Sequence, residues 1–444
     1  MSPIAIDETN GHANGTVSKS APTTSPAQTS KYHASTSDEA IHAEHTYAAH
    51  NYHPLPIVFA KALGTKVWDP EGREYLDFLS AYSAVNQATA TPNFSRAFYN
   101  DVFPRFAQFV TEYFNFDVVL PMNTGAEAVE TAIKIARKWG YKSKAIPANK
   151  ALVLSVAENF HGRTFSAISM STDPESRDNY GPFLPAIGSV CPATGKPIPF
   201  NDVPAVRAAF ETHGKEIAAF IVEPIQGEAG IVVPDDNYLR DIRALCDEHN
   251  ILLICDEIQT GIARTGKLLC HEWAGIKPDM VLLGKAISGG MYPPGTHGST
   301  YGGNPLGCAV AMRALEIVQE EGLTDRAQRL GEVFRKGLED LKSPMITTIR
   351  GKGLLNAIVI DEARTGGHSA WDLCMLMKEK GLLAKPTHEN IIRLAPPLVI
   401  TEEEIKKALS IIDEAVRELP TLKGKKEDEV IPDGEKDVKI GIEN

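Results

Sequence analysis

Short apolar runs alternate with amphipathic stretches through the middle of this sequence. The runs are rich in Ile, Val and Leu, which is typical of strands that are buried on both faces. Strands that alternate with helices predict an α/β fold with a mostly parallel sheet, covered by helices on both sides. Ligands of such sheets bind at the carboxyl ends of the strands. The predicted strands are residues 151–156, 217–223, 251–256 and 280–285, and the predicted helices between them are 127–139 and 238–249.

The pattern changes after Gly322 and predicts a smaller second α/β domain. Its predicted helices are residues 325–341, 370–380 and 402–419, and its predicted strands are 354–360 and 391–394. Over the whole chain we expect a disordered tail at 1–38, a segment at 39–85 that packs with the small domain, a large domain at 86–322, the small domain at 323–422 and a polar tail at 423–444.

Composition and charge narrow the class of protein. The chain has 444 residues, of which 43% are apolar, and its formal net charge is −12. This charge disfavours nucleic acid and anionic membranes as partners, and no apolar run is long enough to span a membrane. The six cysteines lack metal-ligand spacing, so we expect a reducing compartment and no structural zinc. Residues 1–40 contain no Arg and no apolar signal segment, which favours the cytoplasm.

Two strand ends carry the residues that suggest chemistry. The strand at 251–256 ends in Asp256 and the strand at 280–285 ends in Lys285, so a parallel sheet brings both to one edge. Each has an ordinary explanation alone, because an acidic residue there can cap a helix or bind magnesium and a lysine can reach solvent. Together they fit pyridoxal phosphate. A lysine amine forms a Schiff base with this cofactor, and a carboxylate keeps its ring nitrogen protonated.

Residues 123–127 offer the phosphate site that such a cofactor needs. Thr124 and Glu127 predict a capping box at the start of the first helix. Gly125 would let backbone N–H groups approach a phosphate at the positive end of that helix, although an ordinary capped helix is the simpler alternative. No complete dinucleotide fingerprint or P-loop is present in the sequence, so nucleotide binding is unsupported.

A series of motifs in a fixed order resembles the class III (ω-) aminotransferases of fold type I, and among them the ornithine δ-aminotransferases. The resemblance runs from about His45 to Leu422. Several blocks in the same order are far more specific than any one of them. The blocks are His-Asn-Tyr-His-Pro-Leu-Pro at 50–56, Tyr-Ser-Ala-Val-Asn-Gln at 82–87, Pro-Met-Asn-Thr-Gly at 121–125, Asn-Phe-His-Gly-Arg at 159–163, Val-Glu-Pro-Ile-Gln-Gly-Glu at 222–228, Asp-Glu-Ile-Gln at 256–259, Leu-Gly-Lys at 283–285 and Gly-Ser-Thr-Tyr-Gly-Gly-Asn at 298–304.

The resemblance implies a site for pyridoxal 5′-phosphate at identifiable positions. Lys285 would hold the cofactor covalently and then act as the base and acid that moves the substrate proton. Asp256 would pair with the ring nitrogen, Gln259 would hydrogen-bond the 3′-oxygen, and Phe160 would stack on the ring. Judged by residue type alone, Phe160 is more often a core residue than a stacking platform.

The phosphate end of the cofactor is implied in the same way. The backbone N–H groups of Gly125 and Ala126 would bind the phosphate. Thr300 would be contributed by the other subunit, which implies a homodimer with shared active sites.

The resemblance also implies a substrate pocket for L-ornithine and 2-oxoglutarate. Tyr52 and Arg163 would bind the α-amino and α-carboxylate groups of ornithine, and Tyr82 is a further pocket residue typical of the ornithine enzymes. Glu228 would neutralise Arg393 while ornithine is bound. With 2-oxoglutarate bound, Arg393 would pair with a substrate carboxylate instead. As alternatives from residue type alone, Arg393 would be a packing arginine in a strand and Tyr52 would only order a loop.

Two stretches depart from the family pattern. Relatives follow the block that ends at Gln87 with a Gly-His-x-His-Pro turn and a helix, which are absent here. A second stretch is absent after Tyr292, where relatives carry a strand and a loop. Both losses lie inside strong motifs, which favours a splice variant or a misplaced intron boundary. We expect an unpaired sheet edge, exposed apolar surface and poor retention of the cofactor as a consequence.

Three functions therefore stay open from the sequence. The first is transfer of the δ-amino group of ornithine to 2-oxoglutarate, which yields glutamate 5-semialdehyde and glutamate. The second keeps the chemistry with acetylornithine or 4-aminobutyrate as the amino donor, because specificity in this class depends on small changes in the pocket. The third is a catalytically impaired homologue or splice variant.

Overall fold

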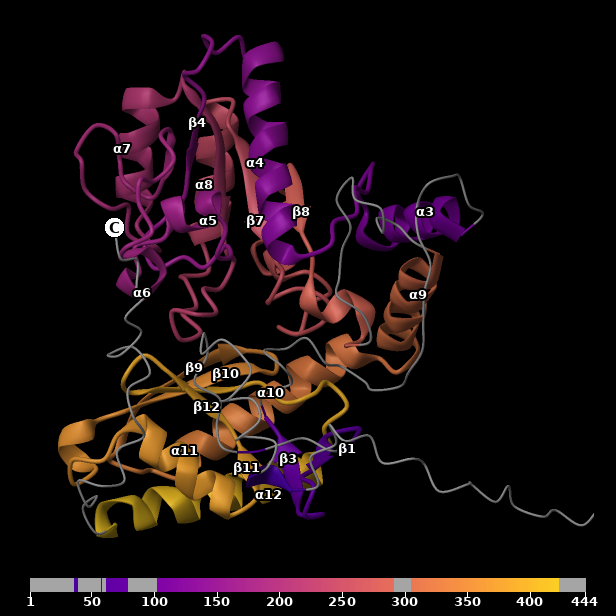
Figure 1. Ribbon diagram of the computed structural model, residues 1–444, viewed down its shortest axis with the longest axis vertical. Helices are drawn as coiled ribbons and strands as arrows, with labels where there is room; N and C mark the ends of the chain where they lie inside the picture. The colour runs from indigo at the N-terminus through magenta and orange to yellow at the C-terminus, as the bar shows by residue number, and fades with distance from the viewer. Residues whose placement is uncertain (1–35, 39–56, 58–60, 79–101, 291–304, 423–444) are drawn as a thin grey trace, which may run out of the picture.

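The computed structural model describes residues 36–38, 57, 61–78, 102–290 and 305–422. These residues form two lobes, one above the other in Figure 1. The upper lobe contains the parallel sheet, and the lower lobe contains most of the chain after α9, Pro305–Glu320, together with the strands near the N-terminus. This is the predicted α/β architecture with a second, smaller α/β unit. The domain limits given above stay a prediction.

The upper lobe is built on a five-stranded sheet in the order β5-β4-β6-β7-β8, and all four neighbouring pairs are parallel. The predicted parallel sheet is therefore confirmed. The bounds are Leu152–Leu154 for β4, Ile187–Gly188 for β5, Ile217–Val222 for β6, Leu252–Asp256 for β7 and Met280–Leu282 for β8.

The central strand β6 shows why this sheet needs helices on both faces. All six of its residues are buried. Phe220 and Val222 pack into one apolar cluster with α7, Val203–His213, and α8, Tyr238–Glu248. Ile221 points to the opposite face, where it packs with α4, Gly125–Lys142. Alternation of side chains along the strand thus divides the core into two layers.

The remaining helices of the upper lobe are short or lie beside it. The bounds are Val102–Phe114 for α3, Phe165–Met170 for α5 and Pro174–Arg177 for α6, with a 3₁₀ turn η1 at Cys270–Ala274 and another, η2, at Lys285–Ser288.

The lower lobe contains two four-stranded sheets. One has the antiparallel order β12-β13-β10-β9, and the other has the order β1-β2-β3-β11, in which β3 pairs in parallel with β11. The second sheet joins the N-terminal strands to the C-terminal part of the chain. The bounds are Lys61–Leu63, Lys66–Trp68 and Glu74–Asp77 for β1 to β3; Ile346–Lys352, Leu355–Ile360, Leu382–Leu383, Lys385–Thr387 and Ile391–Leu394 for β9 to β13; Leu323–Asp340, Ala370–Glu379 and Glu402–Glu418 for α10 to α12; and Glu362–Arg364 and Leu419–Thr421 for the 3₁₀ turns η3 and η4.

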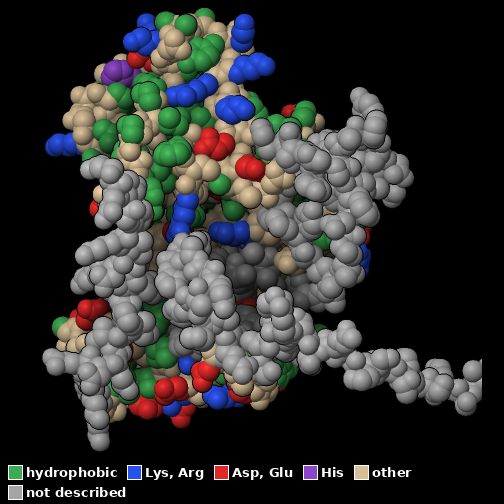
Figure 2. Space-filling view, viewed as in Figure 1, with side chains coloured by type: hydrophobic (Ala, Val, Ile, Leu, Met, Phe, Trp, Pro, Cys, Tyr) green, Lys and Arg blue, Asp and Glu red, His purple; other side chains and the backbone are tan. Residues whose placement is uncertain are grey.

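The surface and the cysteines bear on the class of protein. In the view of Figure 2, basic and acidic side chains are interspersed over the described parts of both lobes. All six cysteines are buried and free. Among the described residues, none of the helices combines the length and the apolar character that a membrane crossing requires.

Candidate active site

Asp256 and Lys285 meet at the carboxyl ends of two neighbouring strands. Asp256 is the last residue of β7 and pairs in register with Leu282, the last residue of β8. The prediction that Lys285 belongs to the strand is wrong, because strand pairing ends at Leu282 and Lys285 opens the 3₁₀ turn η2. Its backbone has a φ of 40°, in the left-handed region that costs a residue with a side chain on the order of 1 kcal/mol. Both side chains nevertheless line one cavity of about 300 Å³.

Hydrogen bonds fix the orientation of the Asp256 carboxylate. His161 Nδ1 lies 2.7 Å from Asp256 Oδ2, and Ser155 Oγ lies 3.1 Å from the other ring nitrogen of His161. An ionised carboxylate can only accept, so Nδ1 carries the proton that is donated to Asp256. The N–H of Ile258 donates to the second carboxylate oxygen at 3.2 Å. Asp256, His161 and Ser155 are all buried, so the three groups form one fixed polar chain behind the cavity.

A second buried carboxylate, Glu223, ties two loops of the site together. One of its oxygens accepts from the N–H of Phe160 at 3.0 Å, and the other accepts from the N–H of Gly227 at 3.2 Å. Burial raises the pKa of Glu223 to about 7, and the negative charge of Asp256 adds to this rise. Nearby His161 and the two N–H donors act in the opposite direction. Glu223 therefore holds the loop of Phe160 against the loop that leads to Glu228.

The electrostatics around Lys285 favour a reactive amine. Burial lowers the pKa of Lys285 below its ordinary value of 10.5, while the carboxylates of Glu228 and Asp256 limit the fall. A lowered pKa increases the fraction of neutral amine near neutral pH. A neutral lysine amine is the form that acts as a nucleophile or a base.

The first turn of α4 forms another wall of the cavity, through Gly125 and Ala126. Thr124 Oγ1 accepts from the N–H of Glu127 at 3.1 Å, which is half of the predicted capping box. The reciprocal hydrogen bond of the capping box, from the N–H of Thr124 to the Glu127 carboxylate, was predicted wrongly. The Glu127 carboxylate instead accepts from the N–H of Asn123 at 2.7 Å. The glutamate side chain reaches one residue further back along the chain. The helix terminus still presents its first turn to the cavity.

An ion pair joins the two lobes beside the cavity. Arg393 in β13 lies in the lower lobe, and its Nη1 is 2.7 Å from Oε1 of Glu228 in the upper lobe. The Arg393 side chain is only 6% exposed, and that of Glu228 is 28% exposed. Gln259 donates to the same Glu228 oxygen at 3.4 Å, and the Thr387 hydroxyl donates to the backbone carbonyl of Glu228 at 3.0 Å. Burial alone would raise the pKa of Glu228, but the charges of Arg393 and Lys285 outweigh burial and hold this pKa below its ordinary value.

The structure brings together most of the residues that the sequence singles out. The residues that line the cavity are Gly125, Ala126, Phe160, Glu228, Asp256, Gln259 and Lys285. Arg393 reaches the site through Glu228. Arg163 is exposed and is not one of the residues that line the cavity. Tyr52, Tyr82 and Thr300 lie outside the described residues.

Three residues of the site were missed by sequence reasoning. Ser155, His161 and Glu223 have no spacing that signals a shared site, since His161 lies 95 positions from Asp256. His161 and Glu223 do stand inside two of the quoted blocks, at 159–163 and 222–228. The block positions were therefore the available signal, and only the fold shows which group each side chain contacts.

The chain belongs to the class-III aminotransferase family. The family model, described as Aminotransferase class-III, matches residues 47–416. A curated ornithine aminotransferase of Emericella nidulans is 69% identical and covers 93% of this chain and 97% of that protein. Another, from Schizosaccharomyces pombe, is 57% identical and covers 85% of this chain and 93% of that protein. A solved ornithine aminotransferase of Toxoplasma gondii, described with PLP at its active site, has a TM-score of 0.81 and 41% identity and covers 87% of this chain and 95% of that chain.

The alignment with the Emericella nidulans protein also shows a difference in length between the two chains. It extends over 442 aligned positions but includes only 93% of the 444 residues of this chain. The number of residues that this chain contributes is therefore smaller than the aligned length. The relative has residues within the match that this chain lacks, in agreement with the shortened stretches predicted from the motifs. Their placement after Gln87 and Tyr292 stays a prediction.

Proposed function

We propose that this chain is a pyridoxal-phosphate-dependent ornithine aminotransferase. It moves the δ-amino group of L-ornithine to 2-oxoglutarate and yields glutamate 5-semialdehyde and glutamate. The observation that carries this proposal is the cavity that Lys285 and Asp256 share with Glu228, whose carboxylate is paired with Arg393. An amine, a ring-facing carboxylate and a neutralised arginine are the groups that this reaction needs.

The groups around the cavity fit the cofactor. Asp256, oriented by His161, offers a fixed negative charge for a protonated ring nitrogen. The first turn of α4 offers N–H groups for a phosphate, Gln259 offers an amide, and Phe160 offers an aromatic face. Lys285 would hold the cofactor covalently. When bound, the cofactor supplies an electron sink that makes the hydrogen on the amine-bearing carbon acidic.

The residues of this chain perform the remaining steps. The neutral amine of Lys285 accepts the substrate proton and later returns it at a different atom, so one residue serves as base and acid. The Asp256 carboxylate keeps its position throughout, because His161 and the N–H of Ile258 hold it in place. Arg163 binds the α-carboxylate of ornithine, with Tyr52 and Tyr82 as further pocket residues.

Glu228 and Arg393 select between the two substrates. Ornithine has a single carboxylate, so Arg393 stays paired with Glu228 while the δ-amine reacts. 2-Oxoglutarate has a second carboxylate, which replaces Glu228 on the guanidinium in a bidentate pair. The same pocket thus accepts a cationic and an anionic substrate in turn.

The assembly and location of the protein form part of the same proposal. We infer a homodimer in which Thr300 of one subunit contributes to the phosphate site of the other. The free cysteines support a reducing compartment, and we place the protein in the cytoplasm. Analytical ultracentrifugation tests whether the protein is a dimer. Imaging of a tagged chain beside a mitochondrial marker tests whether the protein is in the cytoplasm.

Borohydride reduction of the loaded protein, followed by peptide mapping, tests the cofactor assignment. The label should appear on Lys285, and Lys285→Ala should abolish both the visible absorbance of the bound cofactor and transamination. A label on another lysine would overturn the assignment. Turnover with ornithine, N-acetylornithine and 4-aminobutyrate as alternative donors tests the substrate. A preference for either of the latter two would refute ornithine as the substrate.

A further inference from the structure

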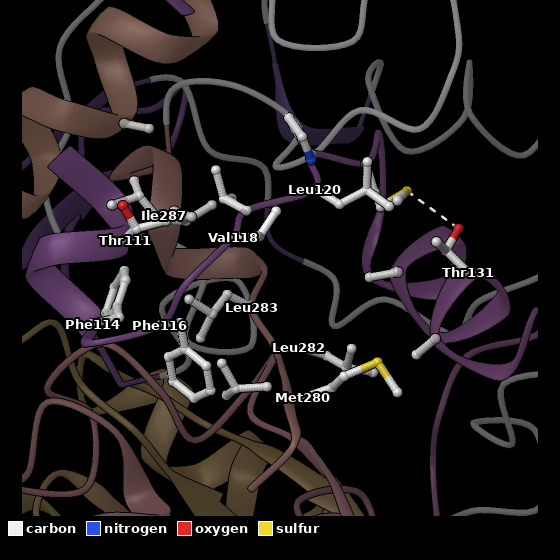
Figure 3. A pocket seen from close by; sticks show the side chains of 18 of the residues that line it. Thr111, Phe114, Phe116, Val118, Leu120, Thr131, Met280, Leu282, Leu283 and Ile287 are labelled. Carbon is white, nitrogen blue, oxygen red and sulfur yellow. Dashed lines mark hydrogen bonds between the residues drawn. The ribbon is translucent and has the colours of Figure 1, made fainter. Parts of the chain in front are cut away.

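A cavity of about 580 Å³ beside β8 is separate from the active-site cavity (Figure 3). Figure 3 shows mostly apolar side chains around it, among them Val118, Leu282 and Leu283. The two cavities share none of their lining residues, and no group that binds Glu228 lines the one beside β8. Any further residue that acts on Glu228 lies instead at the contact between the two lobes.

Glu228 lies at the tip of a tight hairpin, residues 226–232, in the upper lobe. Gln226 and Val232 close this hairpin with two backbone hydrogen bonds, of 3.1 and 2.9 Å. At the tip, the N–H of Gly230 donates to the carbonyl of Gly227 at 3.1 Å. These bonds fix the shape of the hairpin, but they do not fix where its tip lies against the lower lobe.

Three side chains of the lower lobe bind the tip of the hairpin. Arg393 of β13 pairs with the carboxylate of Glu228 at 2.7 Å. Thr387 of β12 donates its hydroxyl to the backbone carbonyl of Glu228 at 3.0 Å, and Arg350 of β9 donates from Nε to the backbone carbonyl of Gly230 at 2.8 Å. Neither carbonyl accepts from a backbone N–H of another described residue. The lower lobe therefore supplies the partners that hold the tip in place.

The register of the lower sheet places these three side chains on one face. Arg393 lies directly opposite Ala357, and Ala357 lies directly opposite Arg350 on the next strand. Residues that pair directly point to the same face of a sheet. Arg393 also pairs with Lys385, and Thr387 lies two residues further along the same strand, so Thr387 shares this face. One face of the sheet thus provides the partner of the carboxylate and the donors to the two carbonyls.

Gly230 shows how closely the tip packs against this face. Its backbone has a φ of 96°, and a Cβ at this position would lie 2.7 Å from Ile391 Cδ1 and 2.9 Å from Arg350 Nη2. These distances are shorter than ordinary contacts, so the tip lies directly on the sheet. A shift of the tip along the sheet would carry Glu228 with it.

We propose that Thr387 is a positioning residue that helps to select the substrate, a role that rests on the function proposed above. Its hydroxyl fixes the backbone of Glu228 at the place from which the carboxylate reaches Arg393. The ion pair forms only when the tip is in this place, whereas a free Arg393 does not need the tip there. Loss of the hydroxyl therefore weakens the paired state relative to the unpaired state. Arg393 then becomes more available to a substrate carboxylate, and ornithine binds less well relative to glutamate.

Three variants isolate the hydroxyl of Thr387. Thr387→Val removes the hydroxyl and keeps the branched shape of the side chain, whereas Thr387→Ser keeps the hydroxyl. Thr347→Val is the matched control, because the Thr347 hydroxyl also donates to a backbone carbonyl, that of Val359, at 3.2 Å. Thr347 lies in β9 of the same sheet but is exposed and does not line the active-site cavity. Circular dichroism checks that each variant is folded.

Binding of glutarate measures how available Arg393 is, without any need for turnover. Glutarate has two carboxylates but neither an amine nor a ketone, so it binds and does not react. Isothermal titration calorimetry of the loaded protein should show about fivefold tighter binding to Thr387→Val, the factor that one net hydrogen bond corresponds to. Thr387→Ser should restore the affinity of the parent chain, and Thr347→Val should leave it unchanged. Equal affinities of Thr387→Val and the parent chain would overturn the proposal.

A second variant at Glu228 distinguishes positioning from a general structural role. In a Glu228→Gln background the ion pair is already lost, so Thr387→Val should no longer change the affinity for glutarate. A change of the same size in both backgrounds would refute the proposal. With turnover measured as well, Thr387→Val should lower the ratio of kcat/KM for ornithine to that for glutamate by about fivefold. A parent chain that does not react with ornithine would refute the proposed function, while the glutarate titrations would still decide whether Thr387 positions Glu228.

Discussion

Replacement of Glu228 by Gln should affect the two substrates of the proposed reaction in opposite directions. The substitution keeps the shape of the side chain and removes its charge, so Arg393 loses the partner that lies 2.7 Å away. A carboxylate on 2-oxoglutarate or glutamate then binds the guanidinium without first breaking an ion pair. Ornithine offers no such group, so its complex leaves the arginine charge uncompensated.

The size of the effect follows from the burial of the pair. An exposed ion pair contributes about 0–1 kcal/mol, and removal of one partner from a fully buried pair costs about 3–5 kcal/mol. With Arg393 6% exposed and Glu228 28% exposed, this pair lies between the two limits. A value of about 2 kcal/mol corresponds to a factor of roughly 30 in binding. We expect Glu228→Gln to strengthen glutamate binding and to weaken the ornithine half-reaction by up to this factor.

Single-turnover kinetics measures each half-reaction separately. The loaded protein is mixed with ornithine or with glutamate, and the absorbance of the bound cofactor is followed in time. Glu320→Gln is the control, because it removes an exposed partner of Arg313 on the surface and should change neither half-reaction. In an Arg393→Ala background, Glu228→Gln should no longer alter the preference between the substrates. Equal changes in both half-reactions of Glu228→Gln would refute the reasoning.

Three other predictions concern groups behind the cavity. His161→Phe removes the hydrogen bond to Asp256 and should lower the rate of transamination about tenfold. Steady-state kinetics measures this rate, and circular dichroism checks that the fold is intact. An unchanged rate would contradict the positioning function of His161. Burial raises the pKa of Glu223 from 4.5 to about 7. Between these two pH values the folded state therefore retains a proton that the unfolded state has already released. The free energy of unfolding should consequently fall by about 3 kcal/mol as the pH rises from about 4.5 to 7. Urea unfolding at a series of pH values measures this fall, and Glu223→Gln should flatten it. Gly227→Ala would place a Cβ on top of Gln259 Oε1, so the Gln259 side chain must move. The affinity for the cofactor should then fall about tenfold. An unchanged affinity would exclude contact between Gln259 and the cofactor.

The sequence predicted elements well where burial imposes a clear period. The strand β13 begins and ends where the pattern of residues 391–394 places it, because polar Asn390 precedes its apolar residues and two prolines follow shortly after Leu394. The strand β9 was missed, since it lies at the edge of its sheet and its residues Ile346–Lys352 mix Thr, Arg and Lys with Ile. An edge strand buries less surface, so its apolar pattern is weaker.

The site shows the same division between local and long-range information. Asp256 and Lys285 were predicted from the chemistry of two strand ends, which a parallel sheet brings together by its topology. The end of β8 was misplaced by three residues, because the strand stops where its partner β7 stops and no local signal marks that point. The contact between His161 and Asp256 depends on packing between distant segments, which periodicity does not describe.

The position of Lys285 depends on how β8 is held in the sheet. Leu282 is the last residue of β8 that pairs with β7, and Lys285 follows three residues later. The position of the reactive amine therefore depends on a strand that is supported from one side among the described residues. The lobe contact between Glu228 and Arg393 does not involve β8. The proposed selection between the substrates thus depends on this ion pair, whereas the position of the proposed cofactor lysine depends on where β8 ends.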